Sequence, residues 1–415
     1  MTSPNFNGFA ISPDSEQLAE FLEDDGLPNI IRINSDEILY QPPQASFIGT
    51  KYLKGDLLGE GSYSKVKEVL DIETLCRRAV KIVKLRKIRR IPNGLANVKR
   101  EINIMKSLNH RNVIRLIEVF YNEEKMKKYI VLEYCCCNLQ EMLDECPAKR
   151  FPEWQTHYYF CQLAEGVDYL HSRGIIHKDI KPANLLLTVD QVLKITDLGV
   201  SEQLDRFAED DSISTSQGSP VSQAPEIAAG DETFSGFKID IWSCGITLYR
   251  MCATDYPFDG ETIYRLYDAI AKAEYTTPEN ASEHLQALIK GMLAKRAEER
   301  LSMKDVKNSR WFREQKEIIG LGVAMPSAPD NPAFSMTVLS GLKMLVAPEE
   351  VRADQISDDN GTDEVILGAT ACYDITNNAA TSLEAENTTE NGQRSSNHLQ
   401  AQAPTHRKHR KCTIS

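Results

Sequence analysis

Apolar and polar residues alternate in short runs over 52–79, around a glycine-rich turn, and this pattern predicts β-strands. A basic stretch follows at 81–90, and residues 95–108 then place apolar side chains at helical spacing. Two further strands are predicted at 112–121 and 127–134. We therefore expect a small β-rich lobe that contains one helix.

After Leu139 the apolar residues recur mainly at the spacing of helices. The predicted helical runs lie at 141–146, 154–174, 240–253, 263–273, 284–293 and 303–312. A larger α-rich lobe is thus expected to follow the β-rich one, and no internal repeat is visible. The predicted fold class is α+β.

The ends of the chain differ in composition from these two lobes. Residues 1–51 are polar and predict a weakly ordered leader, and proline-punctuated text near residue 325 marks a flanking segment, 313–342. From Gly361 to Gln402 too few large apolar residues occur to offset the entropy of ordering, so 343–415 is predicted to be a disordered regulatory tail. The two lobes together occupy 52–312.

Composition narrows the class of protein. The hydrophobic fraction of 41% and charged fraction of 26% are typical of a soluble globular protein, and no apolar run approaches the ~20 residues of a membrane span. The ten cysteines include three in a row, Cys135 to Cys137, and no C-x-x-C pair, which favours reduced thiols inside a cell. The N-terminus has no secretory signal pattern. A net charge of -12 argues against general affinity for nucleic acid.

Two short motifs have the residue types that phosphoryl transfer requires. The chain reads HKDIKPAN from His177 and DLG from Asp197. Transfer of a nucleotide's terminal phosphoryl group needs oxygen ligands for a metal ion, a clamp on the phosphates and a carboxylate beside the incoming hydroxyl. We predict that Asp179 orients the substrate hydroxyl, that Lys181 stabilises the transferring group, and that Asn184 and Asp197 hold the metal ion.

The remaining parts occur upstream and downstream in the required order. GEGSYSKV spans Gly59 to Val66, and its first two glycines allow the backbone to approach phosphate closely. Lys81, in AVK, can reach the α and β phosphates, and Glu101 on the predicted helix is available to pair with it. The sequence APE at 224–226 closes the loop that begins at Asp197.

With these motifs in order, residues 52–312 resemble a eukaryotic protein kinase domain. The resemblance implies a bilobal kinase fold, and Lys181 makes the chain similar to serine/threonine rather than tyrosine kinases. It implies ATP with Mg²⁺ or Mn²⁺ as cofactors, and an ion pair between Glu226 and Arg300. It also implies nucleotide contacts at Leu58, Gly59, Glu60, Gly61, Ser62, Val66, Ala79, Lys81, Glu101, Leu132, Glu133, Cys135, Leu186 and Asp197. Glu133 and Cys135 would offer backbone groups, and His177 is predicted to be buried rather than to carry protons.

Further details resemble one family within the kinases. The chain has HKD for HRD and DLG for DFG, together with LEYC, RRIPNGLANVKREI, FPEWQTHYYFCQL and TSQGSPVSQAPEIA, and so is similar to the tumour-suppressor liver kinase family. That resemblance implies phosphorylation of the activation-loop threonine of AMP-activated protein kinase and related kinases, in control of energy metabolism, cell polarity and growth. It also implies activation by a pseudokinase and a helical-repeat scaffold. Two alternatives are a pseudokinase-like scaffold, which the presence of Lys81, Asp179 and Asp197 disfavours, and a lipid-anchored adaptor.

Three positions depart from the general kinase pattern. Ser64 stands at the third glycine position, which predicts looser nucleotide clamping, and Leu198 replaces phenylalanine beside the metal-binding aspartate. Lys178 replaces an arginine that grips loop phosphate through a planar fork, and lysine is only a point charge. We therefore expect loop order to come from binding partners rather than from phosphorylation.

The last four residues, CTIS, fit a prenylation signal at Cys412 and follow the basic cluster HRKHRK. One lipid chain anchors only marginally and needs such a basic patch to hold an anionic membrane surface. We expect a cytoplasmic protein that associates with membranes through this end, with a nuclear pool if the basic run at 86–90 serves import. The alternatives are an unmodified terminus and a basic run that is only solvated.

Overall fold

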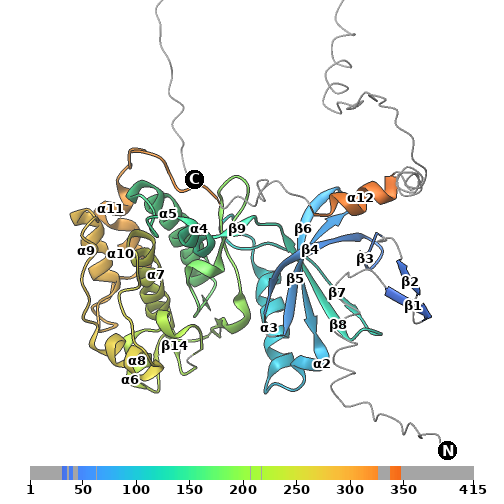
Figure 1. Cartoon of the computed structure of the whole chain (residues 1–415). Helices are drawn as coiled ribbons and strands as arrows, with labels where there is room; N and C mark the ends of the chain where they lie inside the picture. The colour runs from blue at the N-terminus through green and yellow to red at the C-terminus, as the bar shows by residue number, and fades with distance from the viewer. Residues whose placement is uncertain are drawn as a thin grey trace, which may run out of the picture. The chain divides into compact units, whose positions relative to one another are not determined.

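The computed structural model describes most of the chain between residues 30 and 346 (Figure 1). The described residues are 30–34, 37–40, 45–61, 63–205, 207–215, 217–325 and 337–346, the first two as strands only. The predicted contact Ser62 lies outside them, as do Cys412, the basic C-terminal cluster and most of the predicted leader and tail.

A six-stranded antiparallel sheet forms the small lobe. Its order is β3 (Phe47–Ile48), β4 (Tyr52–Glu60), β5 (Ser64–Asp71), β6 (Cys76–Lys84), β8 (Lys127–Glu133) and β7 (Leu116–Asn122). The short helix α2 (Leu85–Ile88) and the helix α3 (Gly94–Ser107) follow β6. Strand β3 lies inside the predicted leader, and there Ile48 is buried against the sheet core. Strands β1 (Ile30–Asn34) and β2 (Glu37–Tyr40) pair with each other.

The large lobe is mainly helical, and its apolar core is continuous with side chains of α3 and of the small sheet. Its helices are α4 (Leu139–Glu145), α5 (Glu153–Ser172), α6 (Pro225–Ala229), α7 (Gly236–Cys252), α8 (Ile263–Lys272), α9 (Glu283–Met292), α10 (Met303–Asn308) and α11 (Arg310–Arg313). Phe160 and Leu170 of α5 and Trp242 of α7 are fully buried in the shared core. The predicted bilobal α+β kinase fold is confirmed.

Short strands frame the motifs that carry the chemistry. Strand β10 (Ile175–Ile176) precedes the HKD sequence, and β12 (Leu193–Ile195) precedes the DLG sequence. Strands β9 (Cys137–Asn138) and β11 (Leu185–Leu187) complete a small sheet with β12. The single turn η1 (Pro182–Asn184) contains the end of the HKDIKPAN motif, and η2 (Leu198–Val200) contains the last two residues of DLG.

Three predicted boundaries were wrong, each because of a specific contact. The strand predicted from residue 112 begins only at Leu116, because the segment before it bonds instead to Ile195 of β12. The helix predicted over 303–312 is divided at Ser309, whose side chain caps α11 by accepting from the Phe312 amide. Helix α7 starts before Asp240, at Gly236, because the Ser235 side chain caps its first turn by accepting from the Lys238 amide at 3.3 Å.

The helix α12 (Leu339–Val346) contacts β4 of the small lobe. It crosses the predicted border between the flanking segment and the disordered tail, and residues from 347 on lie outside the described part of the chain. Within the described residues, no helix has the length and apolar character needed to cross a bilayer. The eight cysteines found there are all free thiols.

Candidate active site

The register of the small sheet collects several predicted nucleotide contacts on one face. Val66 lies opposite Lys81, and Ala79 lies opposite Leu132. Directly opposed residues of antiparallel strands point to the same face, as do residues two apart on one strand. Val66, Ala79, Lys81 and Leu132 therefore share a face of the sheet. Leu186 enters from β11 of the large lobe.

An ion pair joins Lys81 to the helix α3. Lys81 Nζ lies 2.6 Å from Glu101 Oε1. Glu101 faces the sheet because the apolar stripe of α3, which includes Val98 and Ile102, is buried on that side. Burial alone would lower the pKa of Lys81, but the Glu101 and Asp197 carboxylates outweigh it and hold the pKa above its ordinary value. Lys81 is thus charged and fixed in place.

The glycine-rich turn between β4 and β5 is closed by a backbone hydrogen bond from Gly61 to the Ser64 carbonyl, 2.8 Å long. At Gly59 an added Cβ would meet nothing within 4 Å. The protein's own packing therefore gives no reason for a glycine at that position, whereas the approach of a phosphate does. Leu58 is exposed at 43%, and Glu60 pairs with Lys65 at 3.6 Å.

Asp179 is the centre of a hydrogen-bonded cluster in the large lobe. Its Oδ2 accepts from Lys181 Nζ at 2.8 Å and from Asn184 Nδ2 at 2.9 Å. Its Oδ1 accepts from the Ser219 amide at 2.7 Å. Burial would raise the pKa of Asp179, but the hydrogen bonds from Lys181 and Ser219 prevail and lower it. The carboxylate is therefore ionised at neutral pH.

Asp240 holds the backbone on which Asp179 stands. It is fully buried in the first half of α7 and accepts from the backbone amides of His177 at 2.8 Å and Lys178 at 2.9 Å. His171 also contacts Asp240, at 2.9 Å. Lys178 has a positive φ of 67°, a conformation that those bonds sustain. We did not predict this role from the sequence, although an acidic residue beside the apolar run DIWSCG was a usable signal.

His177 is fully buried, as predicted, and does not face solvent. Its Nε2 lies 3.0 Å from the Thr196 carbonyl, and its Nδ1 accepts from the Asp179 amide at 3.2 Å. The ring thus connects the HKD loop to the residue before Asp197. Its contacts orient these two segments relative to each other.

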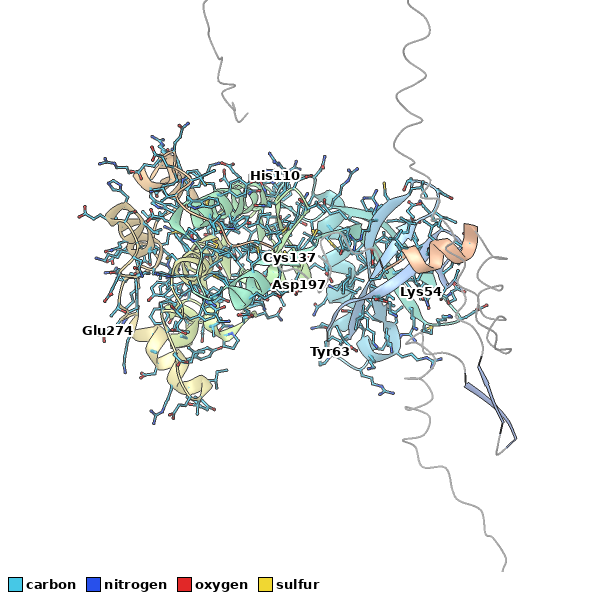
Figure 2. The ribbon with its side chains drawn as sticks, turned by 45° about the horizontal axis from the view of Figure 1, so that its top comes forward. Lys54, Tyr63, His110, Cys137, Asp197 and Glu274 are labelled. Carbon is cyan, nitrogen blue, oxygen red and sulfur yellow. The ribbon has the colours of Figure 1, made fainter. Side chains whose placement is uncertain are left out.

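Asp197 lies in the large lobe on the side that faces the small lobe (Figure 2). Its Oδ1 is 3.7 Å from Lys81 Nζ, and its side chain is 52% exposed. The buried Leu198 holds the turn against α3, so leucine fills the apolar position usually taken by phenylalanine. A Cβ at Gly199 would lie 3.3 Å from Asp197 Oδ1 and would crowd the carboxylate.

The oxygen atoms of Asp197 and Asn184 are ligands of the kind that a hard divalent cation prefers. Asp197 offers carboxylate oxygens. The side-chain NH₂ group of Asn184 donates hydrogen bonds to Asp179, so the Asn184 side-chain oxygen is left as a possible metal ligand. The Thr196 amide donates to the Asn184 carbonyl at 3.0 Å, which ties the two ligand-bearing segments together. Mg²⁺ and Mn²⁺ both accept such oxygen ligands.

The hinge is the segment that joins the two lobes and includes Glu133 and Cys135. A side-chain contact fixes it in addition to its backbone hydrogen bonds. Glu133 Oε1 accepts from the Arg115 amide at 2.8 Å and from Lys194 Nζ at 2.9 Å. Lys194 lies on β12, so this carboxylate connects both lobes, a role that the sequence did not indicate. Burial raises the pKa of the Cys135 thiol far above its usual range, so that it stays protonated.

Two ion pairs organise the loop from Asp197 to Glu226, which we call the activation segment. Arg300, only 1% exposed, donates to both oxygens of Glu226, each at 2.9 Å. Lys178 Nζ lies 3.0 Å from Glu202 Oε2 and donates to Thr215 Oγ1 at 2.9 Å. Burial would raise the pKa of Glu202, but bonds from Thr215 and Lys178 lower it, so this acid is ionised.

The bilobal fold and the site together define the chain as a protein kinase. The site combines Lys81 paired with Glu101, the Asp179 carboxylate held by hydrogen bonds, and the glycine-rich turn between β4 and β5. In agreement, a sequence model of the protein kinase domain matches residues 52–312. The Homo sapiens serine/threonine-protein kinase STK11 is 54% identical over 346 residues, which cover 81% of this chain and 80% of that protein. The Gallus gallus STK11 is 52% identical over 354 residues, covering 83% and 80%.

A more distant relative is the serine/threonine-protein kinase par-4 of Caenorhabditis briggsae, 42% identical over 306 residues, which cover 72% of this chain and 47% of that protein. The chain belongs to the protein serine/threonine kinases of the STK11 liver kinase family. Membership in the kinase family implies the use of ATP and a divalent metal ion.

Proposed function

We propose that this kinase phosphorylates the activation-loop threonine of AMP-activated protein kinase and related kinases, and thereby controls energy metabolism, cell polarity and growth. The proposal extends the resemblance to the liver kinase family, and the similarity to STK11 proteins over about four fifths of the chain supports it. We further propose that a pseudokinase and a helical-repeat scaffold activate the enzyme.

The observation that carries the chemistry is the ionised Asp179 beside Lys181. Asp179 accepts a hydrogen bond from the substrate hydroxyl and orients it toward the phosphoryl group. Lys181 Nζ lies 2.8 Å from Asp179 Oδ2 and 2.5 Å from Ser219 Oγ, and these contacts support a role in balancing charge on the transferring group. Both side chains are held by contacts from the activation segment, so the disposition of that segment determines their readiness.

Asn184 and Asp197 are proposed to hold Mg²⁺ or Mn²⁺, and the ion would neutralise charge on the outer phosphates. Lys81 is proposed to bind the α and β phosphates while Glu101 fixes its position. The sheet face with Val66, Ala79 and Leu132 and the opposing Leu186 would enclose the adenine, and the backbones of Glu133 and Cys135 would read its edge.

The proposal is tested by phosphate transfer from ATP to a catalytic domain of AMP-activated protein kinase. The assay compares the isolated chain with the chain assembled with its pseudokinase and scaffold partners. We expect strong labelling of the activation-loop threonine only in the assembled enzyme. Labelling of a generic peptide without labelling of this threonine would reject the substrate proposal and leave the kinase activity intact. A failure to label any target would instead favour the scaffold or adaptor alternatives.

The contacts of Lys178 support activation without loop phosphorylation. The Lys178 side chain is 2% exposed, and the carboxylate of Glu202 stands 3.0 Å from its ammonium group. Thr215 donates to the same carboxylate at 2.6 Å. A buried cation needs an anionic partner, and here a side chain of the activation segment supplies one in place of a phosphoryl group. Glu202 therefore supplies the negative charge opposite Lys178 without any phosphorylation of the segment.

Alanine in place of Ser212, Ser214, Thr215 or Ser216 should leave partner-stimulated activity largely intact, because Lys178 keeps Glu202. Ser216 lies outside the described residues. Glu202→Gln should lower activity about tenfold or more, because it removes the charge that Lys178 contacts. Initial rates of the assembled enzyme test both predictions, and melting temperatures check that each variant folds. Loss of activity in any of the four alanine variants at unchanged stability would defeat the idea.

We also propose that Cys412 is prenylated and that the basic cluster before it helps to hold an anionic membrane surface. Cys412→Ser should move the cytoplasmic kinase from the membrane fraction to the soluble fraction of cells without changing its specific activity. An unchanged distribution would indicate an unmodified terminus. A nuclear pool that disappears when the basic residues 86–90 are neutralised would assign that run to import.

A further inference from the structure

The segment 337–346 follows the large lobe in the chain but packs on the small lobe, where α12 contacts β4 (Figure 1). Val338 is fully buried and forms an apolar cluster with Leu53 of β4 and Leu70 of β5. Leu342 packs against the same cluster. A segment outside the predicted kinase domain thus completes part of the core of the sheet.

A polar contact accompanies this packing. The Thr337 amide donates to Glu68 Oε2 at 3.0 Å, and its hydroxyl donates to the same oxygen. The Asp56 amide in turn donates to Thr337 Oγ1 at 2.8 Å. Glu68 is fully buried, and a buried carboxylate requires such partners. The segment therefore covers an acid of the sheet as well as apolar surface.

The other oxygen of Glu68 leads to the hinge between the lobes. Glu68 Oε1 accepts from Arg77 Nε. The guanidinium group of Arg77 lies over the ring of Tyr134, 3.9 Å from the ring centroid. Tyr134 stands between Glu133 and Cys135, the residues proposed to present backbone groups to adenine. The contacts thus form a continuous series from Thr337 through Glu68 and Arg77 to the hinge.

The surface that receives the segment has little room to spare. At Gly55 an added Cβ would lie 2.6 Å from Thr337 Oγ1 and 2.8 Å from Val338 Cγ1, and 3.0 Å from a Glu68 oxygen. At Gly341 it would lie 3.2 Å from Leu53. Both glycines permit the close approach of α12 and the sheet, so even a methyl group at Gly55 should displace the segment.

We propose that segment 337–346 positions the adenine-binding hinge by completing the cover over Glu68, which keeps Arg77 stacked on Tyr134. When the segment leaves, water reaches Glu68, the Glu68–Arg77 attraction weakens in the higher dielectric, and the stack over Tyr134 loosens. The hinge backbone then samples more conformations, and nucleotide binding weakens. The inference requires only that the enzyme bind ATP and is independent of its protein substrate.

The test measures the dissociation constant of a fluorescent ATP analogue for the full-length chain, together with its melting temperature. Thr337→Val removes the hydroxyl that contacts Glu68, and Gly55→Ala displaces the segment. We expect each to weaken nucleotide binding about two- to tenfold, the range for one lost hydrogen bond. Leu345→Ala is the matched control, because Leu345 lies on α12 but is 43% exposed, and it should bind the nucleotide normally.

A double-variant cycle separates positioning from simple stabilisation. Tyr134→Leu removes the ring under Arg77 and should itself weaken nucleotide binding. If the series of contacts transmits the effect, adding Thr337→Val to Tyr134→Leu should cause little further loss. Losses that multiply independently would overturn the proposal, as would variants that melt earlier but bind the nucleotide like the unaltered chain.

Discussion

Asp197→Ala should reduce phosphoryl transfer about a hundred- to a thousandfold, the cost of removing a group that stabilises charge in the transition state. The variant should still fold, because the Asp197 side chain is 52% exposed and lies 3.7 Å from Lys81 rather than in the core. Initial rates of labelling by the assembled enzyme measure the loss, and thermal unfolding confirms that the chain is intact.

Asp190→Ala provides the matched control for Asp197→Ala. Asp190 is an exposed aspartate of the large lobe in the turn before β12, so its removal changes net charge equally without touching the site. It should transfer phosphate at the normal rate. A variant lacking Asp197 that kept a substantial share of the activity would contradict the assignment of this carboxylate. A cellular function that survived Asp197→Ala would instead support the adaptor alternative.

Arg300→Ala should destabilise the large lobe by about 3–5 kcal/mol, the usual cost of breaking a buried ion pair. Arg300 is 1% exposed and holds both oxygens of Glu226 at 2.9 Å, and its guanidinium also donates to the Lys238 carbonyl at 2.8 Å. Its loss leaves those acceptors buried without their donor. The melting temperature should fall by roughly 10 °C.

Arg296→Ala is the control for Arg300→Ala. Arg296 precedes Arg300 by one turn of chain, but its side chain is 70% exposed and its contact with Glu298 measures 3.6 Å. A surface pair of this kind contributes about 0–1 kcal/mol, so the melting temperature should barely change. Equal melting temperatures for the two variants would show that the Arg300 contacts contribute nothing to stability.

The fold class was predictable because it depends on local patterns. Alternation over 52–79 and helical spacing over 95–108 identified the small lobe, and long helical runs such as 154–174 identified the large one. The predicted ends of helices and strands were wrong where a contact with a residue far along the chain changed the path of the backbone. Residues 112–114 have the composition of a strand, but they pair with Ile195 of β12 instead of the small sheet.

The positioning residues were less visible than the reactive ones. Asp179 and Asp197 stand in motifs whose chemistry demands those residue types. Asp240 and Glu202, by contrast, look like ordinary acids in the sequence, and their importance comes from partners such as His177 and Lys178 that lie far along the chain. Charged residues are usually exposed to solvent, so the sequence alone predicts that Asp240 and Glu202 are surface acids.

By itself the sequence determined the kinase family, the two lobes and the types of group available for phosphoryl transfer, because short motifs and local periodicity specify these. Only the tertiary structure decided which charges meet. It buried Glu68 beneath Thr337, a residue 269 positions away, and it placed Glu202 against Lys178. Such contacts depend on how distant elements pack, and a pairing between two isolated charges leaves no periodic pattern in the chain.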